Sequence, residues 1–234
     1  MVRQVADGVH LLRLGGANAY LVETDDGLAL VDCGTPGKAD DVRSAVARLG
    51  LADGRIRTIL VTHHHVDHVG SLAAVARASG APVWAPRADA AVIQGEVAPP
   101  PPGTRIGRLL WPVLRRLLPD AEPAVVGREI DDGDDLPLGS GSRAVHTPGH
   151  TPGHTAYLLD RDGGVLIAGD AASNLVGIRS GASLIMAAVA SDPAAARASL
   201  AHLSTLQFEV AVFGHGRPLN RGASERFREA VRRR

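Results

Sequence analysis

Hydrophobic and polar positions divide the chain into two halves of similar design. Short runs of β-branched and other apolar residues predict strands, and apolar residues repeated every three or four positions predict helices. The first half has predicted strands at residues 9–14, 19–23, 28–31 and 56–61 and predicted helices at 38–49 and 69–79. The second half has predicted strands at 125–130, 143–146, 155–159, 165–168 and 208–213 and predicted helices at 193–206 and 224–232. Strands with helices in each half favour an α/β fold of two packed sheets with helices outside them.

An insert at about residues 95–124 interrupts this pattern. Four prolines at 99–102 form a stiff run, and from Thr104 to Leu118 apolar residues recur at the spacing of one helix face. They are Ile106, Leu109, Leu110, Val113, Leu114, Leu117 and Leu118. Arginines at 105, 108, 115 and 116 supply the polar side. Pro112 is expected to kink or shorten the helix, because proline in a straight helix costs about 3 kcal/mol.

The role of this helix is open at the level of sequence. It packs on the core, or it serves as a lid or wall beside a site, or it contacts a second subunit in a homodimer. Resting on a membrane surface, as basic amphipathic helices do, is the least favoured of these interpretations.

Composition narrows the class of protein. With 234 residues and 45% hydrophobic content, we predict a single domain over residues 1–234 that includes the insert. A net charge of zero gives no general attraction for nucleic acid. The single Cys33 excludes an intramolecular disulfide, and the first residues lack a basic stretch followed by a long apolar run, so a cytoplasmic location is expected. No apolar segment approaches the ~20 residues that span a bilayer, which argues against integral membrane association.

The segment Thr62-His-His-His-Val-Asp-His68 places four metal-binding side chains after a predicted strand. In an extended segment His63 and His65 point the same way and can hold one ion. Asp67 and His68 lie past the bend and can reach a second. Imidazole and carboxylate ligands without thiolate suit zinc, which is the default expectation, and also manganese, iron or cobalt.

Three later segments end predicted strands with further ligands. His146-Thr-Pro-Gly-His150-Thr-Pro-Gly-His154 offers three histidines, one of which should face the metals. Asp170 follows the strand at 165–168 and could bridge two cations. His215 follows the strand at 208–213.

The order H-x-H-x-D-H, then H, D and H, resembles that of the metallo-β-lactamase superfamily of metallohydrolases, over Leu28 to His215. The resemblance implies a four-layer αββα sandwich and two divalent metal ions. The ligands it implies are His63, His65 and His150 for the first ion, Asp67, His68 and His215 for the second, and Asp170 as the bridge. It also implies that Asp32 braces the histidine loop rather than serving only as a strand-end turn residue. His64 is expected to point away, and His150 is preferred over His154 as the ligand.

This ligand set predicts hydrolysis. Two cations about 3.5–4 Å apart can share a hydroxide at neutral pH that attacks a carbonyl, and Asp67 is the best candidate to hold and pass its proton. The predicted substrate is a small molecule with an ester, thioester or lactone bond, and the 3% aromatic content favours aliphatic acyl groups. The branch stays open between glyoxalase II-like and lactonase-like. The lactonase branch has a tyrosine where Ser173 stands, and the glutathione thioesterase branch uses lysines, of which this chain has only Lys38.

Two other classes remain. A mononuclear iron persulfide dioxygenase uses a similar scaffold with two histidines and an aspartate at the metal, and metal analysis with an oxygen-uptake assay would distinguish it. A non-catalytic metal-binding protein is the other alternative. Such a protein would be expected to have lost ligands, and none is missing here.

Overall fold

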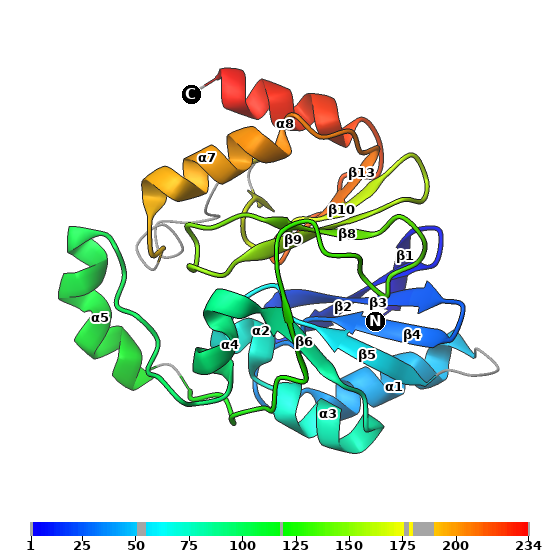
Figure 1. Ribbon diagram of the computed structural model, residues 1–234, viewed down its shortest axis with the longest axis horizontal. Coiled ribbons are helices and arrows are strands. Elements are labelled where there is room, and N and C mark those ends of the chain that lie inside the picture. The colour runs from blue at the N-terminus through cyan, green and yellow to red at the C-terminus, as the bar shows by residue number, and fades with distance from the viewer. Residues whose placement is uncertain (1, 51–54, 118, 176–177, 180–189, 234) are drawn as a thin grey trace.

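Two β-sheets lie face to face in this protein, and helices cover the outer side of each sheet (Figure 1). The computed structural model describes residues 2–50, 55–117, 119–175, 178–179 and 190–233. The predicted α/β class and four-layer αββα arrangement are confirmed.

The larger sheet has seven strands in sequence order. They are β1 (Val2–Ala6), β2 (Val9–Leu14), β3 (Ala17–Thr24), β4 (Gly27–Val31), β5 (Ile56–Leu60), β6 (Val83–Pro86) and β7 (Arg128–Ile130). Strands β1 to β4 pair antiparallel, whereas β4 to β7 pair parallel. Parallel neighbours need crossover connections, and these carry α1 (Ala39–Leu49), α2 (Val66–Val69), α3 (Leu72–Ser79), α4 (Arg87–Ile93) and α5 (Arg105–Leu117).

The smaller sheet has the order β13, β10, β9, β8. Its strands are β8 (Arg143–His146), β9 (Thr155–Leu159), β10 (Val165–Ile167) and β13 (Val210–Val212), and β10 and β13 are parallel. A short ribbon of β11 (Ser173–Asn174) and β12 (Ile178–Arg179) lies between β10 and α7 in the chain. Helices α7 (Pro193–Leu203) and α8 (Ala223–Arg232) cover the outer face of this sheet.

The strand residues alternate between two apolar layers because successive side chains of a strand point to opposite faces. On β3, Leu21 packs with Val42 of α1 in the outer layer, while Tyr20 and Val22 pack between the sheets. On β10, Leu166 packs toward the α7 and α8 side. Three buried clusters therefore hold the four layers together.

Most predicted elements are present, and the differences are local. The predicted strand at 125–130 begins only at Arg128, and the predicted helix at 69–79 begins only at Leu72 as α3, with the separate short helix α2 before it. Strands β1, β6, β11 and β12 and helices α2 and α4 were not predicted. The segment Val83–Pro86 is short and ends in proline, and α4 follows it at once without a turn signal.

Helix α5 lies in the predicted insert and stands apart from both sheets (Figure 1). It runs through Pro112 without a break, and Leu118, the last residue of the predicted helix, lies outside the described residues. Core packing is the wrong interpretation for its apolar face, since Ile106, Leu109 and Val113 are 68%, 79% and 60% exposed. Within the described part of the chain, no helix is long and apolar enough to cross a membrane.

Candidate metal centre

Strand ends from both sheets deliver the predicted ligands to one edge of the sandwich. In the larger sheet, β4 ends before Asp32 and its parallel neighbour β5 ends before the β5–α2 loop (residues 61–65), which carries His63 and His65. In the smaller sheet, the parallel strands β10 and β13 end before Asp170 and His215. The β8–β9 loop (residues 147–154) adds His150.

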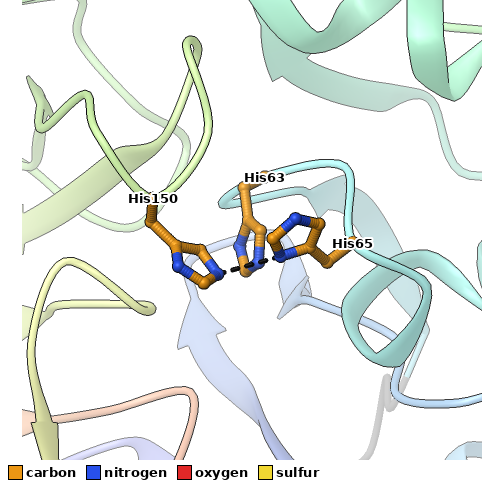
Figure 2. Close-up of side chains that lie close together, drawn as sticks. All are labelled: His63, His65 and His150. Carbon is orange, nitrogen blue, oxygen red and sulfur yellow. Dashed lines mark hydrogen bonds between the residues drawn. The ribbon is translucent and has the colours of Figure 1, made fainter. Parts of the chain in front are cut away.

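His63, His65 and His150 form the first group of converging side chains (Figure 2). One ring nitrogen of each lies within 4.8 Å of the others, and His65 Nδ1 is 2.9 Å from His150 Nε2. Burial and the neighbouring imidazoles hold the pKa of His63 and His150 well below the ordinary value, and they lower the pKa of His65 to about 3. The three rings are therefore neutral at physiological pH, which is the form that binds metal.

Asp67, His68 and His215 form the second group. Helix α2 begins at Val66, so that Asp67 and His68 lie in its first turn. His215 Nε2 is 3.1 Å from Asp67 Oδ2, and His68 Nε2 is 3.9 Å from the same oxygen. Asp67 and His215 are 36% and 17% exposed at their side chains, whereas His68 is fully buried. This group forms the solvent-facing side of the centre.

The carboxylate of Asp170 lies between the two groups. Its Oδ2 is 3.3 Å from His150 Nε2 and 3.5 Å from His215 Nε2, and its Oδ1 is 3.7 Å from His68 Nε2. Burial raises the pKa of Asp170 to about 6, although the imidazoles of His68 and His215 favour its ionised form. A carboxylate in this position can contact two cations at once.

Three of the atoms that converge here have no hydrogen-bond partner in the described part of the protein. Among the described residues, His63 Nε2, His68 Nε2 and Asp170 Oδ1 are buried without a hydrogen-bond partner, and the three side chains form one converging group. A buried polar atom without a partner costs about 1–3 kcal/mol. A divalent cation can bind imidazole nitrogens and carboxylate oxygens at the same time. These residues therefore fit the metal ions that the resemblance implies.

Asp32 fixes the orientation of the second group, as the resemblance implied. Its Oδ1 accepts a hydrogen bond from Thr62 N at 2.8 Å, and its Oδ2 accepts from His68 Nδ1 at 2.8 Å. The bond to Nδ1 leaves His68 Nε2 free to face the centre. Outer hydrogen bonds of this kind set the tautomer and direction of a metal-binding imidazole.

Thr62 extends the same arrangement to the first group. Its hydroxyl donates to Asp32 Oδ2 at 2.8 Å and lies 3.0 Å from His63 Nδ1. Because the hydroxyl proton is committed to Asp32, the Thr62 oxygen accepts the proton of His63 Nδ1. One aspartate therefore directs Nε2 of both His63 and His68 toward the centre.

His154 holds the bridging carboxylate instead of joining the ligands. Its Nε2 accepts the backbone N–H of Asp170 at 2.8 Å, and its Nδ1 lies 2.8 Å from Thr147 Oγ1. Burial and nearby imidazoles lower the pKa of His154 to about 3, which keeps Nε2 available as an acceptor. Of the three histidines in this segment, His150 is the one that lies with His63 and His65, and His146 lies at the surface, 3.1 Å from Pro152 O.

A buried carboxylate that the sequence pattern did not single out connects the two loops of the first group. Asp89 lies on α4 and has no exposed surface. Its Oδ2 accepts from His64 N at 3.0 Å and Thr151 Oγ1 at 2.7 Å, and its Oδ1 accepts from Gly153 N at 2.8 Å. His64 Nδ1 lies 2.9 Å from the same Oδ2, so the buried ring of His64 is directed at Asp89 and does not join the converging groups. Asp89 therefore ties the β5–α2 loop to the β8–β9 loop.

The two tyrosines of the chain connect the sheets directly behind the centre. Tyr20 of β3 donates to Phe213 O at 2.7 Å and accepts from Phe213 N at 3.1 Å, just before His215. Tyr157 of β9 donates to Val61 O at 2.5 Å, just before His63. The larger sheet is thereby hydrogen-bonded to the end of β13, which precedes His215. The smaller sheet is hydrogen-bonded to the end of β5, which precedes His63.

The structure brings together all seven side chains predicted as metal ligands. Asp89 and the tyrosines had no signal that marked them as part of a site. The only local hint at Asp89 is an acidic residue among alanines on an apolar helix face.

Comparison with known proteins places the site in a family. A family model for the metallo-beta-lactamase superfamily matches residues 12–215. The probable metallo-hydrolase YflN of Bacillus subtilis is 29% identical over 92% of this chain and 86% of its own length. A hydroxyacylglutathione hydrolase of Albidiferax ferrireducens is 51% identical, but the match spans only 22% of this chain and 19% of that protein.

Solved structures agree with the fold. BJP-1, a subclass B3 metallo-beta-lactamase of Bradyrhizobium japonicum, has a TM-score of 0.71 at 25% identity and covers 99% of this chain and 89% of its own. The MIM-2 metallo-beta-lactamase has a TM-score of 0.68 at 27% identity, with 97% of this chain and 80% of that chain covered.

Proposed function

The chain belongs to the metallo-β-lactamase superfamily, and from that premise we propose that it uses two divalent metal ions to hydrolyse an ester, thioester or lactone bond of a small acyl-type substrate. Its relatives in this superfamily are metal-dependent hydrolases, and the chain is one of them. The dinuclear centre, zinc as its metal and the class of bond cleaved are the parts that we propose.

One observation carries the proposal, namely the convergence of two three-residue groups on either side of one buried carboxylate. His63, His65 and His150 would hold the first ion, and Asp67, His68 and His215 would hold the second. Asp170 would contact both ions. When bound, such a pair of ions supplies a hydroxide at neutral pH and polarises the carbonyl that it attacks.

Asp67 is the residue that we assign to the attacking water. Burial opposes its ionisation, but the charge of His68 and the hydrogen bond with His215 outweigh burial and hold the pKa of Asp67 well below the ordinary value. An ionised carboxylate accepts a hydrogen bond from water and orients the lone pair that attacks. Because its pKa is low, Asp67 would hold the proton of the water only briefly before passing it to the leaving group.

Three observations bear on the class of acyl substrate that we propose. Ser173 stands where the lactonase branch has a tyrosine, and its side chain is 1% exposed, so it offers no phenol to a substrate. Several hydroxyacylglutathione hydrolases match parts of this chain, which supports thioesters as a substrate class. The chain lacks the lysines of that branch apart from Lys38, so glutathione itself would need other contacts.

A substrate screen with metal analysis tests the proposal. Purified protein is loaded with zinc and assayed against aliphatic thioesters, lactones, aryl esters and phosphodiesters, with His63→Ala as the inactive control. We expect hydrolysis of one or more carbonyl substrates, loss of that activity with a chelator, and recovery with zinc. One iron per chain with oxygen uptake on a persulfide would instead identify a dioxygenase-like enzyme and overturn the proposal.

A further inference from the structure

Helix α5 has an apolar face that the described part of the molecule does not cover. We propose that α5 docks this face onto the surface of an anionic lipid bilayer. The proposal concerns binding alone and does not depend on the reaction proposed above.

The exposed apolar residues of this protein are concentrated in one place. Seven large hydrophobic side chains are exposed among the described residues, and four of them lie on α5. These are Ile106 at 68%, Leu109 at 79%, Leu110 at 45% and Val113 at 60%. The spacing i, i+3, i+4 and i+7 places these four on one side of the helix. A patch that gathers most of the exposed apolar residues indicates an interaction surface.

The positive charge of α5 indicates that its partner is negatively charged. Arginines 105, 108, 115 and 116 lie within α5, and no acidic residue occurs between Glu96 and Asp120. At 100° per residue Arg105 and Arg108 lie off the Ile106–Val113 face and Arg116 lies at its edge, so the helix combines an apolar side with charges that are all positive. Helices with these two features lie flat in the headgroup region of bilayers. Arginines near an anionic lipid surface add electrostatic attraction that salt weakens.

A second copy of this chain is a poorer match for the same surface. Pairing two α5 helices would join two segments that each carry four arginines and no acidic residue. The chain as a whole has zero net charge and so offers no general attraction to the helix. An anionic bilayer supplies both the apolar layer and the negative charge.

The base of α5 is fixed next to the candidate metal centre. Gly103 N donates to Ala190 O at 2.9 Å, and the adjoining Ser191 N donates to His150 O at 3.1 Å. A Cβ on Gly103 would lie 1.9 Å from Ser191 O, so the two segments are in close contact. Thr104 Oγ1 accepts from Gly107 N at 2.9 Å and caps the first turn. A bilayer held by α5 would therefore lie on the side of the molecule that carries His150.

Vesicle co-sedimentation tests this proposal with the full chain. The vesicles are neutral phosphatidylcholine or phosphatidylcholine with 30% phosphatidylglycerol, at several salt concentrations. The apolar variant is Leu109→Gln with Val113→Gln, and the charge variant is Arg105→Gln with Arg108→Gln and Arg116→Gln. Val125→Gln, an 83% exposed residue outside the helix, is the apolar control, and Arg3→Gln with Arg13→Gln and Arg197→Gln is the charge control.

We expect binding to anionic vesicles that is at least tenfold tighter than to neutral vesicles and that weakens with salt. Each α5 variant should lose at least tenfold in affinity, and both controls should bind as the wild type does. Thermal melting and metal content, which these exposed positions should leave unchanged, exclude misfolding. Binding that survives both α5 variants, or its complete absence, would overturn the proposal. So would a dimer in light scattering that the apolar variant abolishes without any vesicle binding, because the face would then be a subunit contact.

Discussion

Replacing Asp89 with alanine should weaken both the fold and the metal centre, although Asp89 is not itself a predicted ligand. The substitution removes the acceptor for two backbone N–H groups, those of His64 and Gly153, and for the hydroxyl of Thr151. All three bonds are buried, and each comes from a loop that carries a predicted ligand.

The size of the effect follows from these lost bonds. A buried donor left without its acceptor costs about 1–3 kcal/mol, and water entering the space left by the carboxylate would restore part of that. We therefore expect the free energy of unfolding of the metal-free protein to fall by about 2–5 kcal/mol. Because the freed loops carry the histidines of the first group, metal affinity should fall by about 10–100-fold, as for other outer-shell partners of metal ligands.

Two assays separate these effects. Urea unfolding followed by circular dichroism gives the stability of metal-free protein, and competition with a chromogenic chelator gives the affinity for zinc. Asp132→Ala is the matched control, since Asp132 accepts one hydrogen bond, from His146 N at 2.8 Å, at the exposed end of the β8–β9 connection. Asp89→Asn, which keeps the size and one acceptor oxygen, should fall between wild type and Asp89→Ala. If Asp89→Ala matched the Asp132 control in both assays, the connection between the loops would have no energetic role.

Three further predictions concern the centre itself. Asp67→Asn should keep much of the bound metal but reduce kcat by about 100-fold or more, as loss of a proton-transferring group does; turnover equal to wild type would refute the assigned role. Gly214→Ala should lower metal affinity at least tenfold, because its Cβ would lie 2.1 Å from Asp170 Oδ1 and 2.7 Å from His68 Cε1, whereas Gly127→Ala, with 3.6 Å to its nearest neighbour, should not. Zinc affinity should rise with pH by up to tenfold per unit between pH 6.5 and 8.5. Burial disfavours the charged form of His68, but the carboxylates around it outweigh burial and raise its pKa to about 10. A metal ion that binds His68 must therefore displace a proton, and this displacement becomes easier as the pH rises. Titration calorimetry that gave the same affinity across this range would contradict that explanation.

The convergence of the predicted ligands could be anticipated from the sequence, because their segments follow strands and strand ends can be read from local pattern. His63, His65, Asp67 and His68 lie within one short motif, and Asp170 and His215 directly follow apolar runs. The sandwich was predictable for a similar reason, since a continuous apolar run such as residues 19–22 of β3 indicates a strand that is buried on both faces.

The supporting contacts were not predictable, because they join residues that are far apart in the chain. Asp89 binds partners 25 and 64 positions away, and Tyr20 binds Phe213 across 193 positions. No local pattern encodes such pairs. The α5 segment shows a second limit of the sequence. The spacing of its apolar residues predicted an apolar helix face, but it could not predict whether that face packs on the core or stays exposed.

Metal content by inductively coupled plasma mass spectrometry, measured on protein reconstituted with zinc and freed of excess ion, tests the central claim most directly. Two zinc ions per chain are expected for the wild type, about one for His215→Ala, and fewer than one for Asp170→Ala. A wild-type value of one or less, or an unchanged value in Asp170→Ala, would contradict a dinuclear centre built around that carboxylate.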